Sequence, residues 1–340
     1  MRLADNSVKR RWMSRGIDTP PAGLETVAVS RGRMTFGQAL ADRVFRFALR
    51  GATAIFVLII ADLFLQLVRG SWEAIVTFGP KFLITSEWNP VTGKFGALPF
   101  IYGTVVSSAI AIIVASAVGI LAAVFLAEFA PPVIARPVSF LIELLAAIPS
   151  VVFGLWGLFV LAPILATTVD PFLQRAFGFL PIFSGAIYGV GLLTAGLLLA
   201  LMIVPTVAAI SRDLILAVPN ELREASYALG ATRWETVTRV VLPAARGGII
   251  GACVRALGRA LGETIAATMV IGNRPAISVS LFAPSYTLSS VIANEFTEAT
   301  SSIYLSSLLA LGLILFVISI IVNSSARVLM WSMLQRTRAR

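Results

Sequence analysis

The chain has 340 residues, of which 58% are hydrophobic and only 13% are charged, and its mean hydropathy is +0.90. A water-soluble domain of this length carries far more charge, so the composition excludes one. Several stretches of about 20 or more residues have few charges and are long enough to cross a bilayer as helices. Because they are uniformly apolar rather than alternating, a transmembrane barrel is also excluded. We predict an all-α polytopic membrane protein.

The net charge of +10 is compatible with nucleic-acid binding, but the basic residues lie where membrane topology places them. They gather before the first apolar stretch and after the last, at Arg2, Lys9, Arg10, Arg11, Arg15, Arg31, Arg33, Arg43, Arg46, Arg50, Arg327, Arg336, Arg338 and Arg340. We therefore expect no nucleic-acid partner. We expect a multi-pass protein of the cell membrane, with both termini cytoplasmic and an even number of crossings.

No apolar core lies in the first part of the chain, so no cleaved signal peptide is predicted. Residues 1–43 are expected to form a cytoplasmic basic tail and residues 331–340 a second cytoplasmic tail. The first transmembrane helix and an outer loop occupy 44–98, and a transmembrane domain occupies 99–330.

The residue inventory removes most enzyme chemistry. The chain contains no histidine and one cysteine, Cys253, which argues against histidine-based metal sites, histidine acid–base catalysis and disulfides. We expect no metal site and no cofactor. A Gly-x-x-x-x-Gly-Lys-Ser/Thr phosphate loop is also absent from the sequence. The chain is therefore predicted to be no enzyme, and any ATP it uses must be hydrolysed by another polypeptide.

Six spans are predicted from the apolar stretches, at about 44–68, 102–126, 138–162, 183–210, 246–271 and 303–329. With the N-terminus inside, few basic residues fall in the outward segments, which are 70–100, 165–182 and 273–302. The inward segment 211–245 holds Arg212, Arg223, Arg233 and Arg239. This asymmetry agrees with the number of spans.

The inward insert 219–243 has the signals of two short helices. Pro219 and Asn220 open the first, with Asn220 as its cap, and Gly230 suits a left-handed end. Thr232 and Glu235 have the spacing of a capping box for the second helix. Leu242-Pro243 is expected to end it before the next span.

Apolar and aromatic side chains at this water-facing corner indicate an interface; they are Leu222, Tyr227 and Trp234. An ordinary amphipathic connector without a partner is the alternative. The run from Glu224-Ala225 through Gly230 to Leu242-Pro243 resembles the EAA loop of ABC importer permeases, although Ser226 stands where Ala is commoner. The resemblance implies that the two helices dock in a groove of a separate ATPase.

Charged residues within the fifth span form the second candidate site. Arg255, Arg259 and Glu263 are spaced four apart and are expected on one helix face. Because an arginine at the centre of a span costs about 2.5–3.5 kcal/mol on insertion scales, this face is expected to line a substrate pathway. The alternative is a structural ion-pair network with Asp62 and Glu143 as partners.

Small residues recur along the same span. They follow the patterns Gly247-x-x-x-Gly251, Ala252-x-x-x-Ala256-x-x-x-Ala260 and Gly258-x-x-x-Gly262. Such spacings allow close helix packing, and we expect this to be the best-packed helix of the bundle.

Four stretches together resemble the PstC-type permeases of phosphate ABC importers. They are Trp88-Asn89-Pro90 with Phe95-Gly96 and Tyr102-Gly103-Thr104, the run 147–157, the EAA-like loop, and the run 258–273. The resemblance covers about residues 40–335. It implies a MetI-like permease core with one extra N-terminal helix. It also implies PstB-type ATPase subunits, a PstA-type second permease and a PstS-type phosphate-binding protein as partners, in a lipid bilayer.

The function expected from this resemblance is that of a channel-forming permease subunit for ATP-driven import of inorganic phosphate, working by alternating access. Another oxyanion, such as sulfate or molybdate, is the nearest alternative. A secondary transporter driven by an ion gradient, with Asp62, Glu143 and Glu263 as proton carriers, is a second. A role in membrane signalling remains open.

Overall fold

The computed structural model describes residues 36–338. Of the two predicted tails, 1–43 and 331–340, residues 1–35 and 339–340 lie outside the described residues. The described chain is helical, and its only strand-like pairing is an isolated bridge between Asn89 and Lys94. The predicted all-α class is confirmed. The chain divides into one unit ending at Asp62 and another beginning at Leu63.

The α-helices are α2 (Phe36–Gly70), α3 (Trp72–Phe78), α4 (Lys81–Ile84), α5 (Leu98–Val124), α6 (Pro132–Ala146), α7 (Ser150–Trp156), α8 (Ala162–Ile164), α9 (Asp170–Phe177), α10 (Leu192–Leu216), α11 (Asn220–Ala228), α12 (Arg233–Thr236), α13 (Leu242–Leu261), α14 (Ile265–Val270), α15 (Leu288–Glu295) and α16 (Ser302–Arg338). Four π-helical segments continue or join them: η1 (Phe125–Phe129), η2 (Gly157–Leu161), η3 (Leu165–Val169) and η5 (Val237–Val241). A 3-10 turn, η4, covers Pro181–Phe183.

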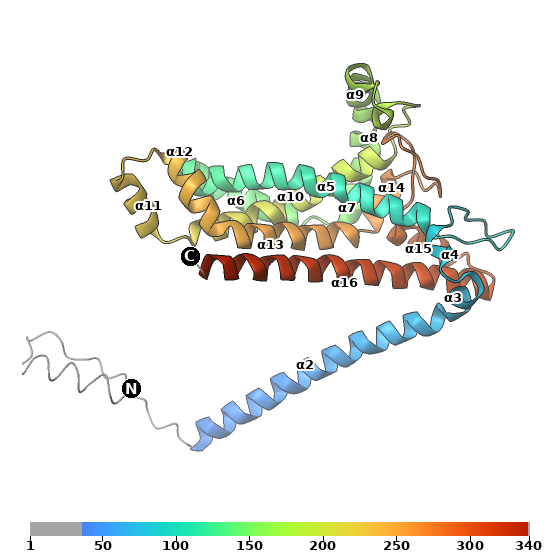
Figure 1. Cartoon of the computed structure of the whole chain (residues 1–340), viewed down its shortest axis with the longest axis horizontal. Coiled ribbons are helices and arrows are strands. Elements are labelled where there is room, and N and C mark those ends of the chain that lie inside the picture. Colours follow the sequence, from blue (N-terminus) through green and yellow to red (C-terminus); the bar gives the residue numbers. More distant parts are fainter. Residues whose placement is uncertain (1–35, 339–340) are drawn as a thin grey trace, which may run out of the picture. The chain divides into compact units, whose positions relative to one another are not determined.

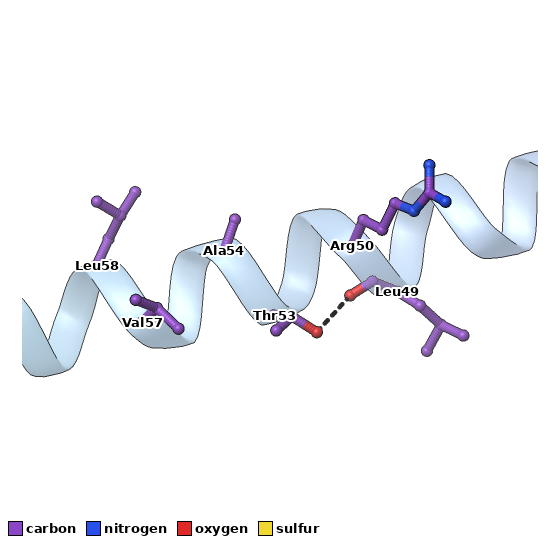
Figure 2. Close-up of a pocket in the computed structure, with 6 residues that line it drawn as sticks. All are labelled: Leu49, Arg50, Thr53, Ala54, Val57 and Leu58. Atoms are coloured by element: carbon purple, nitrogen blue, oxygen red, sulfur yellow. Dashed lines mark hydrogen bonds between the residues drawn. The ribbon is translucent and has the colours of Figure 1, made fainter.

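α2 begins in the first unit and ends in the second. It is apolar around most of its circumference, and none of the residues in its most apolar stretch is buried. A helix that is apolar on all sides is suited to lipid. Figure 2 shows a shallow hollow along this one helix, lined by Leu49, Arg50, Thr53, Ala54, Val57 and Leu58. The Thr53 hydroxyl donates 2.8 Å to the Leu49 carbonyl, so it is satisfied within the helix. The hollow is a feature of an exposed apolar helix surface.

The second unit is a bundle in which α5, α10, α13 and α16 run side by side (Figure 1). α5 and α10 approach each other closely because glycines face branched side chains. A Cβ on Gly119 of α5 would lie 2.9 Å from the Val207 Cβ, and one on Gly196 of α10 would lie 2.7 Å from the Ile110 Cβ. Figure 1 shows α11 and α12 at one end of this bundle, with α3, α4 and α15 at the other.

Within the described residues, six helices are long and apolar enough to cross a membrane, as predicted. The third span is displaced: it covers Ser150–Phe177, whereas the prediction was 138–162. The difference arises at Pro149, which cannot continue a helix; α6 ends before it, and a new helix starts at Ser150. The residues before it form the amphipathic helix α6. The fourth span begins at Leu192, later than the predicted 183.

The fifth span is shorter at its far end than predicted. α13 stops at Leu261, and Gly262 follows it, so α14 is a separate helix. At its other end the helix continues without a break through α12 and η5, and the span covers Arg233–Leu261. Pro243 lies in the first turn of α13, where a missing N–H is tolerated. The preceding π-helical turn accommodates it, so the predicted helix end at Leu242-Pro243 is wrong.

The best-packed helix is α10, and the prediction for the fifth span is wrong in this respect. In the most apolar stretch of α10, 67% of the residues are buried, against 28% in the span that contains α13. The alanine ladder Ala252, Ala256 and Ala260 is buried as expected. Gly247, by contrast, makes no close helix contact, since a Cβ there would meet no described atom within 4 Å.

An aromatic cluster fixes the segment 70–100 to α15 and α16. Trp88 packs edge-on against Phe95 and Phe100, each with ring centroids 4.8 Å away. The Glu295 carboxylate accepts hydrogen bonds from the Trp88 indole at 2.8 Å and from the Tyr304 hydroxyl at 2.7 Å. Such satisfied polar tips allow large aromatic rings to be buried. The segment is therefore a folded part of the bundle.

The close approach of α5 to the segment before α15 gives a stability prediction. A Cβ on Gly103 would lie 2.2 Å from the backbone carbonyl oxygen of Tyr286, so the backbone must move. We expect Gly103→Ala to destabilise the protein by about 1–3 kcal/mol, measured as a lower thermal unfolding temperature in detergent. The matched control is Gly247→Ala, in open space on α13, which should leave that temperature equal or higher. An unchanged temperature for Gly103→Ala would contradict the prediction.

Candidate functional site

The insert between the fourth and fifth spans forms two helices, here called the α11–α12 hairpin (residues 219–236). Gly230 has φ +82° and makes the predicted left-handed turn between them. The Thr232 hydroxyl accepts from the Glu235 amide at 3.3 Å, and the Glu235 carboxylate accepts from the Thr232 amide at 2.9 Å. The predicted capping box is confirmed. The Asn220 cap is wrong, because Pro219 occupies the cap position of α11 and makes no side-chain cap bond.

The hairpin presents an exposed face with apolar and aromatic side chains. Trp234 is 61% exposed, and the predicted Leu222 and Tyr227 are exposed with it. Glu224, Ala225 and Gly230 are exposed as well. Sequence reasoning missed Leu229, which is 89% exposed at the tip of the hairpin. The sequence did contain a signal for this exposure: Leu229 directly precedes the turn glycine Gly230, so it lies at the end of the first helix.

The opposite face of the hairpin is anchored to the spans by a residue that sequence reasoning also missed. Glu128, in η1 at the end of α5, is 7% exposed. Its Oε1 lies 2.7 Å from an Nη of Arg223 in α11 and accepts from the Arg223 Nε at 3.2 Å. The sequence signal was a single acid in the last turn of an apolar stretch. An acid so placed needs a partner if it is buried.

Further contacts hold the hairpin together and to the same turn. The Ser226 and Thr236 hydroxyls are 3.0 Å apart and join the two helices. Arg233 donates to the Glu128 carbonyl oxygen, and its guanidinium lies 5.2 Å from the centre of the Phe129 ring. The hairpin is therefore fixed on one side and open on the other.

The second candidate site lies on α13. Arg255 and Arg259 are both exposed on this helix, one turn apart. Glu263 does not share their helix face, because α13 ends at Leu261. Its Oε1 instead accepts from the Ala266 amide at 3.3 Å, and its backbone carbonyl accepts from the Ser289 hydroxyl at 2.7 Å. The structure thus brings the two arginines together and uses Glu263 to secure the break between α13 and α14.

Asp62 and Glu143, the ion-pair partners predicted for the arginines of this site, lie in different parts of the chain. Glu143 lies on α6 and is 3.9 Å from the Arg212 guanidinium of α10, so it pairs with an arginine outside the candidate site. Asp62 ends the first unit and has an interaction of its own. Among the residues that the structure describes, no ion pair joins Arg255 or Arg259 to an acid.

The chain matches known proteins across almost its whole length. A family model described as "Binding-protein-dependent transport system inner membrane component" matches residues 119–333. The "Phosphate transport system permease protein PstC" of Mesorhizobium japonicum is 48% identical over 320 residues, covering 93% of this chain and 98% of that protein. The protein of the same name from Haemophilus influenzae is 43% identical over 320 residues, covering 92% and 100%. The chain belongs to the family of binding-protein-dependent inner-membrane transport components, among its PstC-type permeases.

Solved structures agree on the fold. A bacterial alginate ABC transporter in complex with a pentasaccharide-bound periplasmic protein has a TM-score of 0.56 at 16% identity, covering 86% of this chain and 95% of that chain. An inward-facing MetNI methionine ABC transporter has a TM-score of 0.50 at 18% identity, covering 68% and 94%. At this level of identity the likeness concerns the fold alone. It confirms the predicted MetI-like permease architecture.

The capping box gives a local prediction. Thr232→Ala removes the acceptor for the Glu235 amide, and loss of such a cap costs about 1 kcal/mol. We expect faster hydrogen exchange of the amides in the first turn of α12. Exchange in α10 should not change. Equal exchange rates in α12 of the variant and the unaltered protein would show that the cap contributes nothing there.

Proposed function

We propose that this chain is a permease subunit of an importer for inorganic phosphate, driven by ATP that a separate ATPase hydrolyses. The observation that carries the proposal is the α11–α12 hairpin, which is fixed to the spans on one face and exposes apolar side chains on the other. Inorganic phosphate is proposed as the cargo because the chain is similar to phosphate transport system permeases. The conduit changes its access from one side of the membrane to the other as the ATPase moves the hairpin.

The partners follow from this role. PstB-type ATPase subunits contact Glu224, Tyr227 and Trp234 on the exposed face of the hairpin. A PstA-type permease completes the conduit, and a PstS-type protein delivers phosphate on the opposite side. The basic residues before the first span and after the last support cytoplasmic termini, which also puts the hairpin in the cytoplasm.

Arg255 and Arg259 are proposed to meet the anion during its passage. Both are exposed on a membrane span, and lipid is an unfavourable neighbour for a guanidinium. A guanidinium is well suited to an oxyanion because it donates several hydrogen bonds in one plane. Since neither arginine is paired with a described acid, each is available to a passing phosphate. Glu263 contributes indirectly, by holding the chain at the break next to them.

The pathway assignment predicts the effect of removing one charge. Arg259→Gln in the assembled complex should lower phosphate uptake into proteoliposomes at least tenfold, because the guanidinium can no longer attract the anion. ATP hydrolysis by the same complex should persist. Arg175→Gln is the matched control, an exposed arginine on α9, and should transport normally.

Three outcomes of this experiment would count against the assignment or the cargo. Normal uptake by Arg259→Gln would remove Arg259 from the pathway. Inhibition of labelled phosphate uptake by equimolar sulfate or molybdate would favour another oxyanion as the cargo. Uptake by the unaltered complex without ATP would favour a transporter driven by an ion gradient.

The docking assignment predicts loss of the ATPase. Trp234→Ala removes the largest exposed aromatic side chain of the hairpin, and aromatic anchors carry much of the energy of an interface. We expect at least tenfold less ATPase to co-purify with the permease. Phe179→Ala, an exposed aromatic residue of the segment after α9, is the control. Undiminished capture by Trp234→Ala would place the docking surface elsewhere.

A further inference from the structure

The buried pair Glu128–Arg223 joins the end of α5 to α10 and α11, with 95 positions of sequence between its two residues. Arg223 belongs to α11, and Glu128 belongs to η1 at the end of α5. The Arg223 guanidinium also donates 2.8 Å to the Ile215 carbonyl and, through its other Nη, to the Val218 carbonyl. These carbonyls lie at and just beyond the end of α10, where the last C=O groups of a helix lack N–H donors within the helix. One side chain therefore fastens the hairpin to both α5 and α10.

The pair is shielded from water, unlike a surface ion pair. The side chains of Arg223 and Glu128 are 13% and 8% exposed. Two donors of the Arg223 guanidinium, Nε and one Nη, contact a single oxygen of Glu128, and the remaining Nη donates to the Val218 carbonyl. Removal of one partner from such a pair leaves a buried charge without compensation. The geometry of the joint therefore depends on both residues.

The second helix of the hairpin is attached to the same turn. Arg233, the first residue of α12, donates to the backbone carbonyl of Glu128 and lies over the Phe129 ring. The Phe129 ring in turn lies 6.3 Å from the Trp234 ring. The first helix of the hairpin therefore contacts Glu128, and the second contacts both Glu128 and Phe129, so both helices are attached to η1.

An apolar core beneath the pair extends the connection into the bundle. Val124 of α5, Ile215 of α10, and Val237 and Val241 of η5 are buried together in it. Farther along, α5 and α10 are packed at the distance that Gly119 permits. The hairpin is therefore connected, through this core, to the ends of α5, α10 and η5.

We propose that Glu128 and Arg223 are positioning residues that transmit the movement of the hairpin to α5 and α10 as one rigid body. This inference rests on the proposed function, in which an ATPase pushes on the exposed face of the hairpin. Glu128 and Arg223 themselves contact neither ATP nor the cargo. Their role is to convert a displacement at the hairpin into a displacement of the spans.

The test measures coupling rather than activity alone. The complete complex, with both permeases and its ATPase, is reconstituted with Glu128→Gln, which has nearly the same shape without the charge. We expect phosphate uptake per ATP hydrolysed to fall at least tenfold, with ATP hydrolysis within about twofold of the unaltered complex. Arg223→Lys, which keeps the charge and loses the fork, should give a similar loss. The double variant should be no worse than the more severe single variant, because the two residues act as a unit.

The matched control is Asp213→Asn, which neutralises an exposed acid on the last turn of α10 and should keep the normal ratio. If Glu128→Gln does not assemble, Glu128→Asp retains the charge at a shorter reach and is measured in its place. A normal ratio of uptake to hydrolysis in Glu128→Gln, or in Glu128→Asp when it replaces that variant, would overturn the inference. A merely structural role would lower the yield of complex and leave this ratio unchanged, which also counts against it.

A second measurement separates this inference from the proposed function. Spin labels at Leu229→Cys and Leu121→Cys, both exposed positions, report the distance between the hairpin and α5 in a Cys253→Ala background. We expect a narrow distance distribution that broadens in Glu128→Gln. If the unaltered complex shows no ATP-dependent uptake, the proposed function fails. The spin-label distances then decide whether Glu128 and Arg223 hold the hairpin rigidly to α5. An equally narrow distance distribution in Glu128→Gln and in the unaltered protein would show that the pair does not hold the hairpin to α5, and would overturn the inference.

Discussion

The bilayer interior contains no water to bind backbone N–H and C=O groups, so a membrane span that begins or ends there needs hydrogen-bond partners from elsewhere in the protein. The clearest case is the start of α10. Its first amides lack partners within the helix, and they are bound instead by a distant segment. Gly191 donates to the Val270 carbonyl at 2.9 Å, Leu192 to Ala283 at 3.2 Å and Leu193 to Leu281 at 2.8 Å. Irregular backbone is thus found where other protein backbone supplies its hydrogen bonds.

Charged side chains obey the same constraint in two ways. Glu128 and Arg223 are buried at the helix ends, where they pair with each other and the arginine also donates to backbone carbonyls near the end of α10. Arg255 and Arg259 are exposed along a span and have no acid among the described residues. The first arrangement suits a fixed joint, because its hydrogen bonds are complete. The second arrangement is suited to transient binding of an anion, because neither guanidinium is paired with a described acid.

Sequence reasoning predicted the features that depend on local chemistry. The number of spans follows from apolar length, and the Gly230 turn and the Thr232–Glu235 capping box follow from residues a few positions apart. It failed where the structure depends on contacts across the bundle. Whether Pro149 or Pro243 breaks a helix is decided by the turns around it: Pro149 separates α6 from α7, whereas a π-helical turn carries the chain past Pro243.

The candidate site divides in the same way. The exposed residues of the hairpin could be predicted, because apolar side chains in a polar insert are unusual. Glu128 could not, because its partner is 95 positions away in the sequence and a single acid near the end of a span has several plausible roles. The placement of Glu263 was missed because its spacing from Arg259 fits a continuous helix, and only the packing against Ser289 and α14 reveals the break.

The three hydrogen bonds at the start of α10 have a mechanical consequence for the whole bundle. A shift of this helix along its own axis by one residue would break all three of them together. The segment from Val270 to Ala283 must therefore travel with α10 as a single block. Any widening beside that block must therefore occur where the block borders another element, and not between α10 and this segment.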